Sequence, residues 1–91
     1  MAASINVTVK NEVGLHARPA AMFVKKASSF KSKVMVENVT RATAPVNAKS
    51  ILSVLSIGVL KDHEIRIQAE GEDEESAIKS LVELIESDFG E

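Results

Sequence analysis

The residues best suited to chemistry lie in one stretch, residues 14–20, which reads GLHARPA. Pro19 breaks a helix internally but is tolerated in its first turn, so the helix that follows starts at or just after His16. The N–H groups of that turn and the helix dipole favour an anion and disfavour a cationic imidazolium. We therefore expect His16 to keep a neutral, nucleophilic ring, beside which the Arg18 guanidinium can bind phosphate oxygens. These residues predict a site that accepts a phosphoryl group and holds it reversibly.

A histidine beside a helix start is also common as a surface or capping residue, and other functions compete with phosphoryl transfer. A metal site needs clustered ligands, whereas His16 and His63 are separated by most of the chain and cysteine is absent. We expect His63 to be solvated, and we expect neither a metal nor a cofactor. A passive interaction domain could expose Met22, Leu52 and Leu55, although these residues fit a core equally well. The acidic residues near positions 70–75 indicate a helix start rather than the paired acid and base of a hydrolase.

Length and composition narrow the class of protein further. The 91 residues suffice for one domain, residues 1–91. The net charge is −2 and the only aromatic residues are three Phe, so a nucleic-acid partner is not expected. No apolar run approaches the ~20 residues of a membrane span, and no leader pattern is present. Together with the absence of cysteine, these features favour a soluble cytoplasmic domain, which we expect to be monomeric and not inserted in a membrane.

Hydrophobic periodicity predicts the elements that must position His16. Apolar residues recur at every second position in some stretches of the chain and at helical spacing in others. They predict strands over residues 4–10, 33–37 and 64–69, a short strand after residue 45, and helices from Ala17, over 51–57 behind a Ser50 cap, and over 73–87. The order β-α-β-β-α-β-α indicates an α+β open-faced sandwich, with a four-stranded antiparallel sheet covered on one side by three helices.

Residues 38–45, between the second and third predicted strands, follow no regular pattern. They contain neither glycine nor a hairpin signal such as Asn-Gly. We therefore expect a mobile loop that tolerates deletion of two or three residues. Pro45 places the short strand after it at an edge of the sheet, because proline cannot donate to a central ladder.

Two stretches of the sequence resemble one known family. Residues 14–20 resemble the active-site signature of HPr, the histidine-containing phosphocarrier of the bacterial phosphoenolpyruvate-dependent sugar phosphotransferase system. Residues 47–51 (NAKSI) and 55–58 (LSIG) resemble the regulatory-serine region of the same family. The resemblance covers nearly the whole chain and matches the predicted element order. The departure is the segment 38–45, where family members usually have a tight turn.

The resemblance implies a carrier rather than an enzyme. It implies that His16 receives a phosphoryl group at Nδ1 from enzyme I, which phosphoenolpyruvate charges, and passes it to the IIA domains of sugar permeases. Arg18 would assist this transfer. Ser50 would be the site of HPr kinase/phosphorylase where that enzyme exists. The docking face implied by the family comprises the loop before His16 and the residues Ala21, Lys25, Ile51, Leu52 and Leu55.

A regulatory relative of HPr remains as an alternative. Such a protein would receive phosphate in a nitrogen-control or catabolite-signalling branch, and its chemistry at His16 would be the same. The two functions therefore differ only in their partners. The Lys-Ser-Ile context of Ser50 favours the member that serves sugar uptake.

Overall fold

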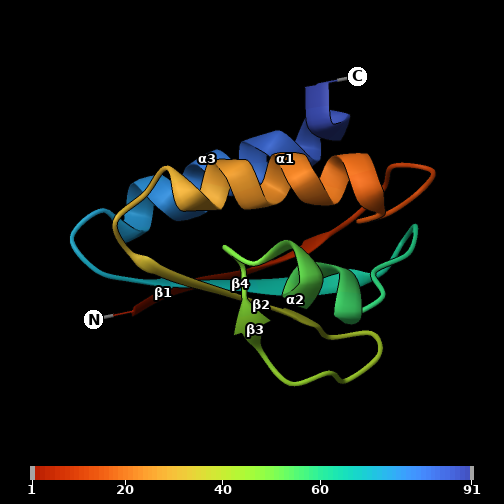
Figure 1. The fold of residues 1–91 in the computed structure, drawn as a ribbon, viewed down its shortest axis with the longest axis horizontal. Helices are drawn as coiled ribbons and strands as arrows, with labels where there is room; N and C mark the ends of the chain where they lie inside the picture. Colours follow the sequence, from red (N-terminus) through yellow and green to blue (C-terminus); the bar gives the residue numbers. More distant parts are fainter. Residues whose placement is uncertain (1, 91) are drawn as a thin grey trace.

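The computed structural model describes residues 2–90, which form a sheet with helices packed on one face (Figure 1). Within these residues the order β-α-β-β-α-β-α is followed by a short 3-10 turn. The elements are β1 (Ala2–Thr8), α1 (Ala17–Ser28), β2 (Lys33–Asn38), β3 (Val46–Asn47), α2 (Ile51–Ser56), β4 (Glu64–Glu70), α3 (Glu74–Glu86) and η1 (Asp88–Gly90). The predicted α+β open-faced sandwich, a four-stranded antiparallel sheet with three helices, is confirmed for the described residues.

The sheet has the strand order β1-β4-β2-β3, and neighbouring strands are antiparallel. β4 lies in the interior of the sheet, where Ile65, Ile67 and Ala69 are buried at alternate positions. The two-residue strand β3 follows Pro45 at one edge, as predicted. Alternation along β2 and β4 was therefore enough to identify which side of these two strands faces the helices.

The strand β1 lies two residues earlier than the predicted span of residues 4–10. Its ladder ends where Thr8 pairs with Glu64, because β4 begins there. Val9 is fully buried, and its N–H donates to the His63 carbonyl in the loop before β4 (2.9 Å). The apolar alternation therefore continues past the end of the strand into a loop contact.

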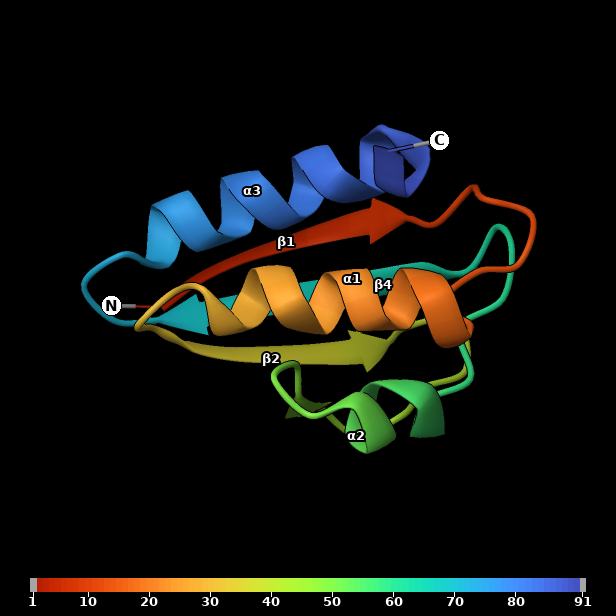
Figure 2. The same cartoon turned by 45° about the horizontal axis from the view of Figure 1, so that its top comes forward.

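The helices form the second layer, with α1 between α2 and α3 (Figure 2). The buried residues recur at helical spacing, Ala20, Phe23 and Ala27 on α1 and Ala77, Leu81 and Ile85 on α3. α2 ends one residue before the predicted end, because Ile57 is its C-cap. Within the described part of the chain, no helix has the length and apolarity that a bilayer crossing requires.

The 38–45 segment, which its composition predicts to be a mobile loop, makes hydrogen bonds within itself and to the start of β4. Asn38 and Thr43 close its base, because the Asn38 N–H donates to Thr43 Oγ1 (2.9 Å) and the Thr43 N–H donates to the Asn38 carbonyl (3.1 Å). The Glu64 N–H donates to Thr40 Oγ1 (2.8 Å), which ties the loop to the start of β4. Side-chain oxygens replace the missing glycine turn, and Ala42 takes the left-handed conformation (φ 56°).

Asp73 links the start of α3 to the connection between α1 and β2. Its carboxylate accepts hydrogen bonds from the N–H of Lys31 (2.9 Å) and from the N–H and hydroxyl of Ser32 (2.9 and 2.5 Å). The Ser32 hydroxyl first, and then the Lys31 N–H, lower the pKa of Asp73 from 3.8 to about 2. The predicted N-terminal acid of the last helix thus binds the α1–β2 connection, while Glu74 and Glu75 occupy the first turn of α3.

The low pKa of Asp73 makes its hydrogen bonds with Lys31 and Ser32 sensitive to acid. Since the pKa is lower in the folded protein than its ordinary value, the stabilisation is complete above pH 3.8 and is lost as the pH falls through about 2. We expect the wild type to be more stable than Asp73→Asn at neutral pH and this difference to shrink in acid. Urea unfolding of both proteins between about pH 6 and pH 2 measures it. A difference that is unchanged at the lowest pH would contradict the assignment.

Candidate functional site

His16 is the N-cap residue of α1, which confirms the predicted helix start. Its backbone is extended (φ −89°, ψ −166°), and its carbonyl accepts the first helical hydrogen bond, from the Ala20 N–H (2.8 Å). The imidazole is exposed and makes no capping hydrogen bond among the residues that the structure describes. The ring therefore lies beside the N-terminus of the helix without capping any of its N–H groups.

The start of α1 offers a favourable environment for an anion. N–H groups in the first turn of a helix have no acceptor within the helix, and they form the positive end of its dipole. This turn reads ARPA, so it contains no carboxylate that would neutralise that end. Ala17 and Arg18 supply the nearest backbone N–H groups, since Pro19 has none. A phosphoryl group on His16 would lie beside these donors.

The loop before His16 is held by a close contact with the loop that precedes β4. Leu15 is buried and its N–H donates to the Val59 carbonyl (3.0 Å). Gly14 takes the left-handed conformation (φ 60°), and a Cβ there would collide with the Val59 carbonyl oxygen and lie 2.7 Å from Leu60 Cα. The Asn11 side-chain amide donates to the Gly14 carbonyl (2.7 Å). His16 is thus attached to backbone that has little room to move.

The contact at Gly14 gives a test with a matched control at Gly58. Both glycines have positive φ, but a Cβ at Gly58 would meet only the exposed Arg41 guanidinium, which can move away. We expect Gly58→Ala to lose about 1–2 kcal/mol of stability from the left-handed backbone alone. Gly14→Ala should lose about 2–4 kcal/mol, because backbone atoms must also shift. Urea unfolding compares the two, and equal losses would show that the Gly14 contact is not tight.

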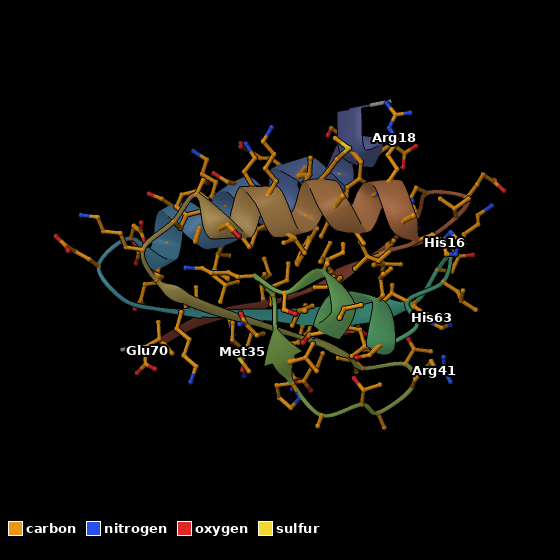
Figure 3. The ribbon with its side chains drawn as sticks, viewed as in Figure 1. His16, Arg18, Met35, Arg41, His63 and Glu70 are labelled. Atoms are coloured by element: carbon orange, nitrogen blue, oxygen red, sulfur yellow. The ribbon has the colours of Figure 1, made fainter. Side chains whose placement is uncertain are left out.

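Arg18 is exposed on the first turn of α1, but its side chain reaches toward the C-terminal turn η1 (Figure 3). It lines a cavity of about 270 Å³ together with Asn11, Glu12, Val13, Pro19, Met22, Asp88 and Phe89. Phe89 is buried there in a left-handed conformation (φ 57°), a feature that the helical pattern of the sequence does not reveal. Arg18 therefore follows His16 by two residues in the chain, and its guanidinium is directed toward this cavity.

Ser50 and the residues after it form the neighbouring surface. Ser50 is the N-cap of α2, as predicted, and its hydroxyl oxygen accepts the Ser53 N–H at 3.4 Å. Leu52 is 77% exposed, and Ile51 and Leu55 are each 38% exposed. These three side chains therefore lie on the surface. For Leu52 and Leu55, the sequence alone was compatible with either the core or the surface.

On α1, Ala21 and Lys25 continue the exposed stripe that begins at Ala17, because residues four apart share one helix face. Met22 is half-buried and packs against the core. Two further apolar residues, Val13 and Leu60, are 56% and 59% exposed, in the two loops that meet at Gly14. They had no periodic signal in the sequence, because both lie outside regular elements.

His63 is only partly solvated and its ring is hydrogen-bonded, which corrects the prediction of a solvated side chain. It is half-buried, and its Nδ1 accepts the Leu60 N–H (3.1 Å) and lies 3.1 Å from Asn38 Nδ2. Asn38 is a fully buried polar residue that the sequence analysis missed. A signal was present, because Val34, Val36 and Asn38 fall on one side of β2 at alternate positions. Among residues 2–90, no group of three or more His, Cys, Asp or Glu side chains could hold a metal ion.

Comparison with known proteins finds similarity over nearly the whole chain. Residues 3–87 match the family model described as "PTS HPr component phosphorylation site". The chain is 44% identical over 84 residues to the multiphosphoryl transfer protein of Haemophilus influenzae, a match that covers 92% of this chain and 17% of that protein. This chain spans between 17% and 23% of the length of such curated relatives.

Solved structures give the same result. The crystal structure of HPr-C-His from Thermoanaerobacter tengcongensis superposes with a TM-score of 0.92 at 50% identity, covering 98% of this chain and 97% of that one. The phosphocarrier protein HPr from Bacillus anthracis superposes with a TM-score of 0.86 at 34% identity, covering 92% and 96% of the two chains.

Proposed function

The chain belongs to the HPr family of phosphocarrier proteins of the phosphotransferase system, and on this premise we propose that it carries a phosphoryl group on His16. The donor is enzyme I, charged by phosphoenolpyruvate, and the acceptors are the IIA domains of sugar permeases. The observation that carries this proposal is the exposed His16 ring at the N-cap of α1, which is not engaged in capping.

The chemistry follows from that position. The lone pair of His16 Nδ1 attacks the phosphorus atom of the donor, so that a new N–P bond forms as the bond to the donor atom breaks and leaves its electron pair there. The N–H groups of Ala17 and Arg18 and the helix dipole stabilise the negative oxygens of the transferred group. Transfer to an acceptor reverses these steps. The protein is therefore a carrier, because the phosphoryl group passes through it and no separate substrate is converted on it.

Arg18 acts as a second stabilising group in this proposal. Its guanidinium would turn from the cavity beside Phe89 toward the phosphoryl oxygens and bind them in a charge-assisted contact. The backbone donors of α1 remain in place without it, so Arg18 assists transfer rather than enabling it.

The docking face proposed for enzyme I and IIA comprises Ala21, Lys25, Ile51, Leu52 and Leu55, whose exposure supports this role. It adjoins His16 because α1 and α2 pack side by side (Figure 2). Leu52 is too exposed to contribute to the core of the fold. Ser50 lies at the edge of this face, which suits regulation by HPr kinase/phosphorylase where that enzyme exists. We place the carrier in the cytoplasm as a monomer.

The experiment that tests the proposal uses phosphoenolpyruvate and a general enzyme I. We expect the protein to gain one phosphoryl group that is labile in acid and stable in base, as a phosphoramidate is, and to lose it when a IIA domain is added. Omission of enzyme I is the control and should give no incorporation. An acid-stable adduct, or none in the complete mixture, would contradict the proposed function.

A further inference from the structure

Asn38 connects two loops by hydrogen bonds inside the molecule. Its side-chain Nδ2 donates to the Ile57 carbonyl (3.0 Å) and lies 3.1 Å from His63 Nδ1, while its Oδ1 accepts the Arg41 N–H (3.2 Å). A carbonyl can only accept and an N–H can only donate, so these contacts fix the orientation of the amide. Asn38 therefore joins the 38–45 loop to the loop formed by residues 57–63.

His63 completes this connection through one nitrogen atom. The Leu60 N–H donates to His63 Nδ1 (3.1 Å), so Nδ1 must be unprotonated and the proton of the neutral ring lies on Nε2. The Asn38 amide is then the second donor to the same Nδ1. The acceptor at His63 thus holds the backbone of Leu60 and the side chain of Asn38 together.

The 57–63 loop in turn supports the loop that carries His16. The backbone of Val59 and Leu60 lies against Gly14, and the Val59 carbonyl accepts the Leu15 N–H. On the exposed side, Lys61 pairs with Glu12 (3.0 Å). His16 directly follows Leu15 in the chain, and His16, His63 and Arg41 lie at one end of the molecule (Figure 3). Any shift of residues 59–60 would therefore be passed to His16.

We propose that Asn38 and His63 form a positioning pair that fixes the His16 ring relative to the first turn of α1. The pair touches neither the phosphoryl group nor the reacting atoms. It acts by holding the Val59–Leu60 backbone on which Gly14 and Leu15 rest. The inference rests on the proposed function of His16, and it assigns the 38–45 loop a part in the site, since that loop folds around Asn38.

Two substitutions at His63 separate positioning from simple packing. In His63→Asn, the side-chain Oδ1 is attached to Cγ, as Nδ1 is, so it can accept from both the Leu60 N–H and Asn38 Nδ2. His63→Leu fills similar space but has no acceptor, so the Leu60 N–H is left unsatisfied and Asn38 Nδ2 loses one of its acceptors. The Leu variant is the test and the Asn variant is the rescue.

The first measurement uses the unphosphorylated protein without any partner. By NMR, we expect His63→Leu to shift the Leu15 and His16 amide resonances and to speed hydrogen exchange of the Leu15 N–H by about ten-fold, whereas His63→Asn stays close to wild type. The ring nitrogen shifts of wild-type His63 should report a neutral ring protonated on Nε2. This last measurement needs no variant, so it decides the matter even if His63→Leu does not fold. A proton on Nδ1 would overturn the proposal.

The second measurement is phosphorylation of His16 by enzyme I. We expect His63→Leu to lower the maximal rate about ten-fold with KM within about two-fold, because the docking residues on α2 are unchanged. His63→Asn should restore the rate. A wild-type rate in His63→Leu, a rise in KM that accounts for the loss, or failure of His63→Asn to restore the rate would each overturn positioning. If wild type accepts no phosphoryl group, the proposed function fails while the NMR result still stands.

Discussion

Replacing His16 by alanine should abolish phosphoryl acceptance from enzyme I and leave the fold intact. The imidazole is the proposed nucleophile, and the neighbouring side chains of the GLHARPA stretch offer no other. The ring is exposed and caps no N–H, and the His16 carbonyl bond to Ala20 survives in alanine, so we expect a stability change within about 0.5 kcal/mol. Incorporation from labelled phosphoenolpyruvate and the melting temperature are measured on the same samples.

His63→Asn is the matched control for this experiment, because it removes the second histidine while keeping the acceptor at that position. It should accept phosphate at close to the wild-type rate. Acceptance that persists in folded His16→Ala would show that another residue is the carrier. Loss of acceptance together with unfolding would show instead that His16 has a structural role, contrary to its exposed position.

Ser50→Asp should strongly reduce phosphorylation of His16 while keeping the protein folded. Aspartate is as good an N-cap as serine, and a negative charge is favoured at the start of α2, so the helix should be retained. The same charge lies beside the exposed Ile51, Leu52 and Leu55, where it would repel an acidic partner surface. We expect a loss of about ten-fold or more in the rate at limiting enzyme I.

Ser50→Ala separates the cap from the charge. It should lose about 0.5–2 kcal/mol of stability, because the Ser53 N–H loses its acceptor, and it should keep nearly the full transfer rate. Melting temperature and initial rate of His16 phosphorylation are measured for both variants. If Ser50→Asp is phosphorylated as fast as wild type, Ser50 serves only as a helix cap.

Much of the fold follows from local rules that the sequence displays directly. Pro19 and the apolar stripe beyond it locate the start of α1 at His16, and Ser50 marks the start of α2. Period-two alternation identifies β2 and β4, and Pro45 identifies an edge strand. Each of these signals depends on residues within one turn or one strand, which is why they could be interpreted without tertiary contacts.

The errors lie where hydrogen bonds join distant segments. Nothing near His63 in the sequence shows that its ring accepts a bond from Asn38, and nothing near Thr40 shows that its hydroxyl binds the Glu64 N–H. The composition of residues 38–45 therefore predicts a mobile loop and does not reveal its hydrogen bonds. The end of β1 was misplaced for the same reason, since the partner of Val9 is the carbonyl of His63. In the sequence, only the position of Asn38, in alternation with Val34 and Val36, indicated that its side chain is buried.

The most direct test of the account is the location of the phosphoryl group after reaction with phosphoenolpyruvate and enzyme I. The chain contains two histidines, so the two positions can be distinguished by fragmentation mass spectrometry under alkaline conditions. We predict one phosphoryl group, carried by the fragment that contains His16 and absent from the fragment that contains His63. A phosphoryl group on His63, or on a residue other than histidine, would contradict the central claim.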